Sequence, residues 1–262
     1  MTQDREGPVT LAVDGPVATV TLNRPDSYNA LDGAMRARMR EVPGEVDAME
    51  GVRVVILKGA GRGFCAGADL ADDRPSDDQL EGLLDREYKP ALTAIAESEK
   101  IWIAQVHGAA AGIGAAFAMN CDLMTMAEDA YVYMAFAAIA LVPDGGNTQL
   151  LLQNMGYHRA METILEGRKV PAAECLSMGI ANKVFPADRL DAETRAWAER
   201  LAGGAPMAMA KAKALLRRVG AVSFGEAISL EGEVQAKLLA SRDHREGGRA
   251  FFEKRAPKFQ GR

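Results

Sequence analysis

The feature that most constrains the fold is a local plan that occurs twice in the first half of the chain. An apolar strand is followed at once by small residues and then by the start of a helix. The first copy leads from Val54–Lys58 into Phe64–Leu70 (FCAGADL), and the second from Trp102–Val106 into His107–Gly114 (HGAAAGIG). Short apolar runs of this kind are typical of strands buried on both faces. The repetition predicts an α/β core with two similar corners.

The small residues at the two corners have two possible explanations. Without large side chains, a ligand can approach the backbone closely. Backbone N–H groups at a loop or helix N-terminus lack partners within the helix, and two of them aimed at one point form an oxyanion hole. Close packing of a helix on a strand also requires small residues, and the spacing alone favours that simpler explanation.

The remaining elements support an α/β core followed by a helical C-terminal region. Predicted strands are Val9–Asp14, Val17–Leu22, Arg53–Lys58, Trp102–Val106, Asp122–Met126, Tyr131–Met134 and Ile180–Phe185. Predicted helices are 33–49 with Asp32 as N-cap, 77–99 interrupted at Pro90, Gly112–Asn120, Thr148–Asn154, Tyr157–Gly167, Ala172–Met178, Arg189–Leu201, Met207–Val219, Phe224–Leu239 and Asp243–Arg255. Strands and helices alternate first, and helices accumulate after Pro143.

Composition excludes several classes of function. A net charge of -5 over 262 residues argues against general nucleic-acid binding, which draws on clustered Lys and Arg. No uninterrupted apolar stretch reaches the length of a membrane span, and the first residues lack a signal-peptide core. The 3 cysteines and 3 histidines show neither disulfide nor metal-ligand spacing. We therefore expect a cytoplasmic protein with no bound metal.

The two corner segments, Phe64–Leu70 and Val106–Asp122, resemble the signature segments of the crotonase, or enoyl-CoA hydratase/isomerase, family. Further matches follow in the same order: Leu22–Pro25, Asn29–Leu31, Leu141–Pro143, Gly179–Val184 and Ala250–Arg255. The resemblance implies a crotonase-type spiral of ββα units over residues 1–200 and a helical C-terminal trimerisation region over 201–262. It also implies a homotrimer, or a hexamer built as a dimer of trimers.

The same resemblance implies an acyl-CoA substrate, with CoA as part of the substrate and no separate cofactor. The N–H groups of Ala66 and Ile113 are expected to form the oxyanion hole, although the family usually has Gly at the second position. The residues expected to bind substrate or CoA are Arg24, Ala30, Ala66, Gly67, Ala68, Asp69 and Lys254, the last from a neighbouring subunit. Cys65 is not expected to act as a nucleophile, because nothing nearby would lower its pKa.

The acids of the site differ from those of family hydratases, which use two glutamates to position and activate water. The matching positions here are Ala116 and Phe136, which we expect to line the acyl pocket. One carboxylate is well placed instead: Asp144 matches the Asp of family isomerases and dehalogenases. A turn or N-cap role would also explain an Asp there. We predict that Asp144 is catalytic and that the chain is an enoyl-CoA isomerase.

Three alternatives stay open. Asp144 could act as the nucleophile of a dehalogenase or hydrolase, although an aromatic content of 6% gives little sign of an aromatic acyl pocket. The chain could bind acyl-CoA without catalysis, since both glutamates are missing. It could also be an enoyl-CoA hydratase with an unusual acid pair, to which Asp72, Asp73 or Asp77 would contribute.

Overall fold

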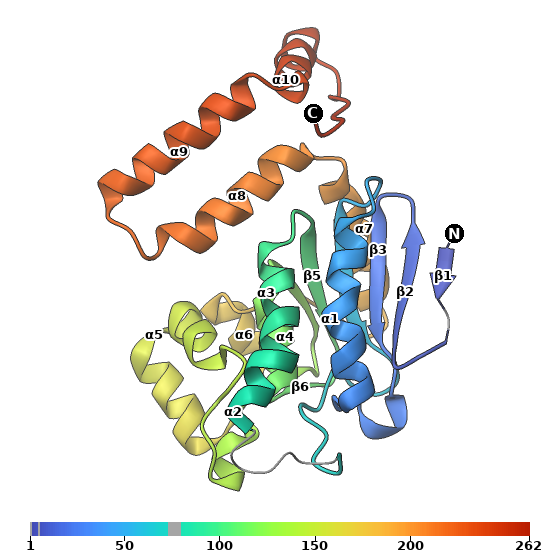
Figure 1. Ribbon diagram of the computed structural model, residues 1–262, viewed down its shortest axis with the longest axis vertical. Coiled ribbons are helices and arrows are strands. Elements are labelled where there is room, and N and C mark those ends of the chain that lie inside the picture. Colours follow the sequence, from blue (N-terminus) through green and yellow to red (C-terminus); the bar gives the residue numbers. More distant parts are fainter. Residues whose placement is uncertain (1, 5, 73–79) are drawn as a thin grey trace.

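The central element is a seven-stranded sheet with the order β1-β2-β3-β4-β5-β7-β10 (Figure 1). The computed structural model describes residues 2–4, 6–72 and 80–262. Strands β1 and β2 and strands β2 and β3 pair antiparallel, and all later neighbours pair parallel. The strands are β1 Thr2–Asp4, β2 Val9–Asp14, β3 Val17–Leu22, β4 Val54–Gly59, β5 Ile101–Val106, β7 Leu123–Ala127 and β10 Lys183–Phe185.

A second, three-stranded sheet explains why the chain forms a spiral. Strand β6 (Ala109–Ala111) pairs parallel with β8 (Tyr131–Tyr133), which pairs antiparallel with β9 (Lys169–Pro171). The chain runs through β5, β6 and helix α4 (Ile113–Asn120), and then repeats the course through β7 and β8. Each turn of the spiral thus adds one strand to the large sheet and one to the small sheet. This arrangement confirms the predicted ββα spiral.

The large sheet is covered by helices on both faces. Helices α1 (Gly33–Asp47), α3 (Lys89–Glu97) and α4 pack on one face, and their apolar side chains join Val55, Leu57 and Trp102 in the main core. Helix α7 (Leu190–Ala202) packs on the other face against Val54, Ile56 and Ile103. Coverage on both faces is the reason that β4 and β5 read as continuous apolar runs.

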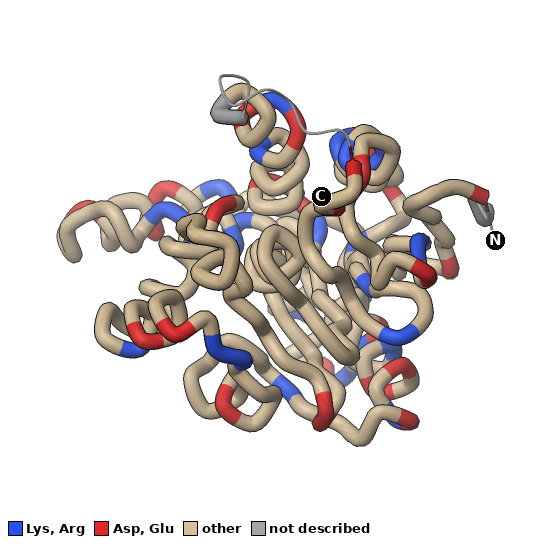
Figure 2. The backbone as a smooth tube through the Cα atoms, turned by 90° about the horizontal axis from the view of Figure 1, so that it is seen from below, with Lys and Arg blue, Asp and Glu red and all other residues tan. Residues whose placement is uncertain are grey.

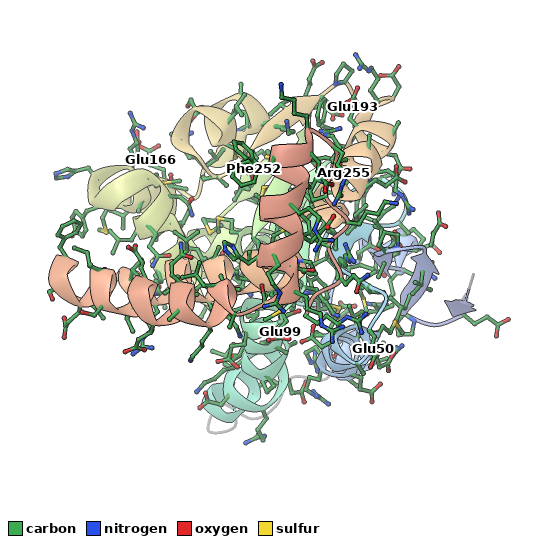
Figure 3. The ribbon with its side chains drawn as sticks, turned by 90° about the horizontal axis from the view of Figure 1, so that it is seen from above. Glu50, Glu99, Glu166, Glu193, Phe252 and Arg255 are labelled. Carbon is green, nitrogen blue, oxygen red and sulfur yellow. The ribbon has the colours of Figure 1, made fainter. Side chains whose placement is uncertain are left out.

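The last three helices form a C-terminal arm (Figure 1). They are α8 (Pro206–Val219), α9 (Phe224–Leu239) and α10 (Arg242–Glu253). Helix α8 is joined to the core by Lys213, which donates to the Ile95 (2.8 Å) and Lys100 (3.0 Å) carbonyls. The arm exposes large apolar side chains: Leu216, Phe224, Ile228, Leu239, Phe251 and Phe252. Phe252 and Arg255 project on opposite sides of α10 (Figure 3). The predicted boundary between residues 200 and 201 falls in the last turn of α7, and the division into two parts stays a prediction.

The remaining helices also follow the predicted pattern, with one irregularity. Helix α6 is Ala172–Met178, and α5 (Asn147–Glu166) breaks at Gly156, whose φ of 73° separates the two helices predicted there. The helix predicted over 77–99 contains a short helix α2 (Leu80–Leu83) and a π-helical turn η3 (Leu84–Tyr88) directly before α3. Pro90 has no N–H to donate to Arg86, and its ring would collide with that carbonyl, so the backbone widens to the π turn. Residues 73–79, which include Asp73, Asp77 and the start of this predicted helix, lie outside the described residues.

Two surface properties bear on function. Basic and acidic residues are interspersed along the tube in Figure 2 and do not gather on one basic face. None of the helices in the described part of the chain is long and apolar enough to cross a membrane.

Candidate active site

The first corner follows β4 and is built by backbone hydrogen bonds. The Phe64 N–H donates to the His107 carbonyl (2.9 Å) and the Cys65 N–H to the Ala109 carbonyl (3.0 Å). In return, the Ala111 N–H donates to the Cys65 carbonyl (2.9 Å). These bonds form a short parallel bridge between the first corner and β6. The two corners begin at Phe64 and His107, which are 43 residues apart in the sequence. The bridge places them side by side on adjacent turns of the spiral.

The structure corrects the first predicted oxyanion donor. The Ala66 N–H donates to the Tyr28 carbonyl (2.9 Å), so it is not available to a ligand. Two residues later the Ala68 N–H has no partner among the described residues. The Gly67 carbonyl accepts from the Leu31 N–H, and the Asp69 N–H donates to the Leu31 carbonyl. The Ala68 N–H lies between these two groups, so it points away from Leu31, as in any extended segment. That direction is toward the second corner.

Gly67 makes this arrangement possible. Its φ of +102° lies in the region that other residues rarely adopt, and it reverses the alternation of the backbone between Cys65 and Ala68. A Cβ on Gly67 would also lie 3.0 Å from the Ala111 carbonyl oxygen and 3.7 Å from the Gly112 Cα. The first corner therefore lies in direct contact with the second.

The second corner presents the start of α4. Gly112 is its N-cap, with φ 52° and ψ −127°, and the Gly112 N–H donates to the Tyr133 carbonyl (3.0 Å). Ile113 is the first helical residue, and its N–H has no partner among the residues that the structure describes. An N–H in the first helical turn points outward along the helix axis, where it can meet an anionic oxygen. Ile113 thus fits the donor role that was predicted for it.

The side chain of Ile113 turns away from solvent and packs under the loop that carries Asp144. It is 2% exposed, and a Cβ on Gly145 would overlap with its Cδ1 atom. Gly145 has a φ of +61°, so this position excludes a side chain on conformational and steric grounds. The contact brings Asp144 next to the second corner.

A second link fixes the Asp144 loop to the same corner. The Asn147 N–H donates to the Asp144 carbonyl (3.0 Å), which closes the turn before α5. The Asn147 side-chain amide donates to the Gly112 carbonyl (2.9 Å). Asp144 and the Ile113 donor are therefore held by one rigid unit, the start of α5 docked on the start of α4.

The environment of Asp144 suits proton transfer. Its Oδ1 atom is buried and has no hydrogen-bond partner in the described part of the chain. Burial, opposed only by a hydrogen bond from its own backbone, raises the pKa of Asp144 to about 6. A carboxyl group with a pKa near the working pH can both accept and return a proton. In the alternative role as an N-cap, the Asp144 side chain would accept hydrogen bonds from backbone N–H groups of α5. Helix α5 has no such side-chain cap.

The two positions predicted to line the acyl pocket differ in depth. Ala116 is fully buried. A Cβ on Gly145 would lie 3.0 Å from the Ala116 Cβ, so the Asp144 loop covers Ala116. Phe136 lies in the 3₁₀ turn η4 (Ala135–Ile139) with its Cζ atom 3.7 Å from the Cβ position of Gly112. The ring therefore borders the second corner, whereas Ala116 forms the layer behind it.

The predicted CoA-binding residues separate into two groups. Arg24 donates to the Ala30 carbonyl (2.6 Å) and pairs with Asp69 of the first corner (3.0 Å) and with Asp32, the N-cap of α1 (3.1 Å), so two acids balance its charge. Asp69 also accepts from the Ala71 N–H (3.0 Å) and caps a turn. Lys254 is the C-cap of α10 in the C-terminal arm, and its side chain makes no hydrogen bond or ion pair with the corners among the described residues.

Cys65 and Asp72, the other candidate reactive groups, are held in interactions with neighbouring residues. The Cys65 thiol is buried, donates to the Asn29 carbonyl (3.1 Å), and has its pKa raised to about 12 by burial, so it stays protonated. Asp72, a candidate second acid, is held by Arg36 (2.9 Å). No group of three or more potential ligands that could hold a metal ion occurs within the described ranges.

Comparison with known proteins identifies the family of this chain. The family model for enoyl-CoA hydratase/isomerase matches residues 13–262. A 1,2-epoxyphenylacetyl-CoA isomerase from Escherichia coli is 34% identical over 255 residues, which cover 95% of this chain and 97% of that protein. An (E)-benzylidenesuccinyl-CoA hydratase from Thauera aromatica is 32% identical over 264 residues, or 97% and 99% of the two chains.

Solved structures agree as well. The crystal structure of an enoyl-CoA hydratase from Bacillus anthracis superposes with a TM-score of 0.93 at 28% identity, covering 97% of this chain and 100% of that one. The match extends over the spiral, both corners and the C-terminal arm. The chain is therefore a crotonase-fold member of the enoyl-CoA hydratase/isomerase family.

Proposed function

We propose that this enzyme moves a double bond within an enoyl-CoA, with Asp144 as the acid–base residue. The observation that carries the proposal is the placement of Asp144. It is a half-buried carboxylate with a raised pKa, fixed to the Ile113 corner, while the two glutamate positions of family hydratases hold Ala116 and Phe136. Isomerisation requires one base that serves two carbons on the same face of the substrate.

The proposed steps use groups of this chain only. Asp144 removes a proton from the carbon next to the thioester carbonyl of a 3-enoyl-CoA, and the electron pair spreads onto the carbonyl oxygen. The N–H groups of Ala68 and Ile113 stabilise the resulting dienolate by donating to that oxygen. Asp144 then returns the proton to the far end of the conjugated system, which yields the 2-enoyl-CoA. Ala68 replaces Ala66 in this scheme because of the Ala66–Tyr28 hydrogen bond.

A direct test presents a 3-enoyl-CoA and a 2-enoyl-CoA of equal chain length to the enzyme in parallel. We expect rapid conversion of the first and little water addition to the second, because hydration requires a second group to activate water. Fast hydration that survives the loss of the Asp144 carboxylate would show that a different acid pair operates. CoA binding without either reaction would favour a non-catalytic protein.

The CoA end of the site belongs to the same proposal. Arg24 organises the loop after β3 through Ala30 and Asp32. The Arg24–Asp69 ion pair and the Leu31–Gly67 hydrogen bond join this loop to the first corner. We infer that the loop binds the nucleotide part of CoA. Lys254 would reach the phosphates from the neighbouring subunit, where a cation forms charge-assisted hydrogen bonds.

The C-terminal arm predicts assembly. Phe251 and Phe252 are 78% and 84% exposed on one short helix, which an isolated subunit would leave in water. We therefore expect a trimer or hexamer by light scattering at micromolar concentration. The double substitution of both phenylalanines by Ser should shift the protein toward the monomer, whereas Leu165→Ser, at an exposed site on α5 (68%), serves as the matched control. A wild-type monomer would contradict the assembly.

A further inference from the structure

Asn147 joins the two halves of the proposed site through one short side chain. It is the first residue of α5 and is fully buried. Its backbone N–H donates to the Asp144 carbonyl (3.0 Å), and its side-chain Nδ2 donates to the Gly112 carbonyl (2.9 Å). One residue therefore contacts both the turn that carries the proposed base and the corner that carries a proposed oxyanion donor.

The Gly112 carbonyl does not need the bond from Asn147 for its own satisfaction. As the N-cap carbonyl of α4, it already accepts from the Ala115 N–H (3.0 Å) and the Ala116 N–H (3.4 Å). Asn147 adds a third donor from outside the helix. The oxygen of the same amide, Oδ1, is buried and has no hydrogen-bond partner in the described part of the chain. An unsatisfied buried oxygen is unfavourable, so stability alone does not explain an asparagine at this position.

The third donor acts on the peptide unit that the proposed mechanism uses. The Gly112 carbonyl and the Ile113 N–H belong to one planar trans peptide, so they point in opposite directions. A donor that holds the carbonyl therefore also fixes the direction of the N–H, and it polarises the peptide so that the N–H becomes a stronger donor. Support from outside matters here, because Gly112 has φ 52° and ψ −127° and a glycine has wide freedom to rotate this peptide.

We propose that Asn147 is a positioning residue whose amide orients and polarises the peptide between Gly112 and Ile113, so that the Ile113 N–H is aimed at the thioester oxygen. The same residue closes the Asp144 turn, so it also couples the position of this donor to that of the base. The inference rests on the proposed function in one respect, namely that the Ile113 N–H meets the substrate carbonyl. It adds a side chain that sets the strength of this donor through the peptide.

The carbonyl stretching frequency of a bound thioester reports this effect without turnover. The probe is hexanoyl-CoA, which has no double bond to move, and an isotope label at its carbonyl carbon isolates the band in infrared difference spectra. Hydrogen bonds to a carbonyl lower its stretching frequency, so we expect the wild type to lower that of the bound probe. Asn147→Leu keeps the approximate size of the side chain but removes the donor, and we expect it to lower the frequency less.

The kinetic effect of Asn147→Leu should fall on kcat. A donor that is present but poorly aimed loses only part of the stabilisation of a full oxyanion donor, so we expect kcat for a 3-enoyl-CoA to fall about 10-fold with KM nearly unchanged. The melting temperature should match or exceed that of the wild type, because the substitution also removes the unpartnered Oδ1. A loss of stability alone would not reproduce this split between kcat and KM.

Asn154→Leu is the matched control. Asn154 also lies on α5 and donates its amide to a backbone carbonyl, that of Leu150 (2.7 Å), but within its own helix. This variant should keep the wild-type frequency shift and kcat. Asn147→Ala is measured beside Asn147→Leu, so that the conclusion does not depend on how a leucine packs in the turn.

The outcomes distinguish the inference from the proposed reaction. A wild-type frequency shift in both Asn147 variants would overturn the inference, and so would an equal loss of the shift in Asn154→Leu. A wild type that lowers the carbonyl frequency but does not isomerise a 3-enoyl-CoA would overturn only the reaction. The positioning role of Asn147 would then still stand on the infrared spectra.

Discussion

Asp144→Asn is expected to lower the isomerase kcat by at least roughly 100-fold, with little change in KM. The substitution keeps the size of the side chain but removes the base, and general acid–base catalysis typically contributes a factor of this order. The turn that carries residue 144 is held by backbone bonds, by Gly145 against Ile113 and by Asn147 on Gly112, so the site should keep its shape. The measurement is steady-state kinetics with a 3-enoyl-CoA.

The pH dependence provides a second readout of the same substitution. With a pKa of about 6, Asp144 becomes an effective base only as the pH rises through that value, so the wild-type kcat should rise to a plateau above it. The residual activity of Asp144→Asn should lack this transition. A wild-type profile that is flat between pH 5 and 8 would mean that another group carries the proton.

The same substitution should stabilise the protein at neutral pH. The pKa of Asp144 is raised in the folded state, so the unfolded chain loses this proton at a lower pH, and stability falls as the pH rises from the unfolded pKa of 3.8 to about 6. Above that range the penalty for the half-buried charge is complete. Asn carries no charge, so we expect a gain of about 1 to 2 kcal/mol at pH 7.5, after a discount for partial exposure. The difference should disappear as the pH falls below 3.8, where Asp144 is protonated in both states, and this convergence is the internal control.

Gly112→Ala is expected to reduce kcat by about 100- to 1000-fold through the backbone alone. The φ of 52° and ψ of −127° at Gly112 are strained for any residue with a Cβ, at a cost on the order of 1 to 3 kcal/mol. Relaxation of this strain rotates the peptide that carries the Ile113 N–H. Removal of one oxyanion-hole donor typically has a kinetic effect of this size.

Steric overlap of the new methyl group is not the cause of the expected fall in kcat. The nearest atoms to a Cβ on Gly112 would be Phe136 Cζ at 3.7 Å and Gly67 Cα at 3.8 Å, which are ordinary contacts. Gly44→Ala, in an open position within α1, is the matched control and should retain full activity. A Gly112→Ala enzyme with wild-type kcat would remove the Ile113 N–H from the mechanism.

The sequence predicts the elements of this fold better than its backbone details. Strands β2 and β3, helices α6 and α9 and the N-cap at Asp32, which accepts from the Met35 N–H (2.8 Å), all occur where their local patterns place them. Local periodicity, turn residues and caps encode such features directly. Strands β6 and β9, of three residues each, were not predicted, because they exist only through pairing with β8.

The identity of the N–H donor at the first corner also could not be predicted from local sequence. Ala66 and Ala68 are equivalent in composition, and both adjoin Gly67. They differ because Tyr28, a distant residue, takes the Ala66 N–H, and because the positive φ of Gly67 redirects Ala68.

The bridge between Cys65 and Ala110 has an evolutionary consequence. The two proposed donors, Ala68 and Ile113, lie on neighbouring turns of the spiral, and strand spacing, about 4.8 Å in any sheet, sets the distance between such turns. Side chains contribute nothing to that distance. Substitutions at positions 116, 136 and 144 can therefore exchange one set of reacting groups for another while the anion-stabilising frame stays constant, so that new reactions can arise in this scaffold without an intermediate that has lost its catalytic framework.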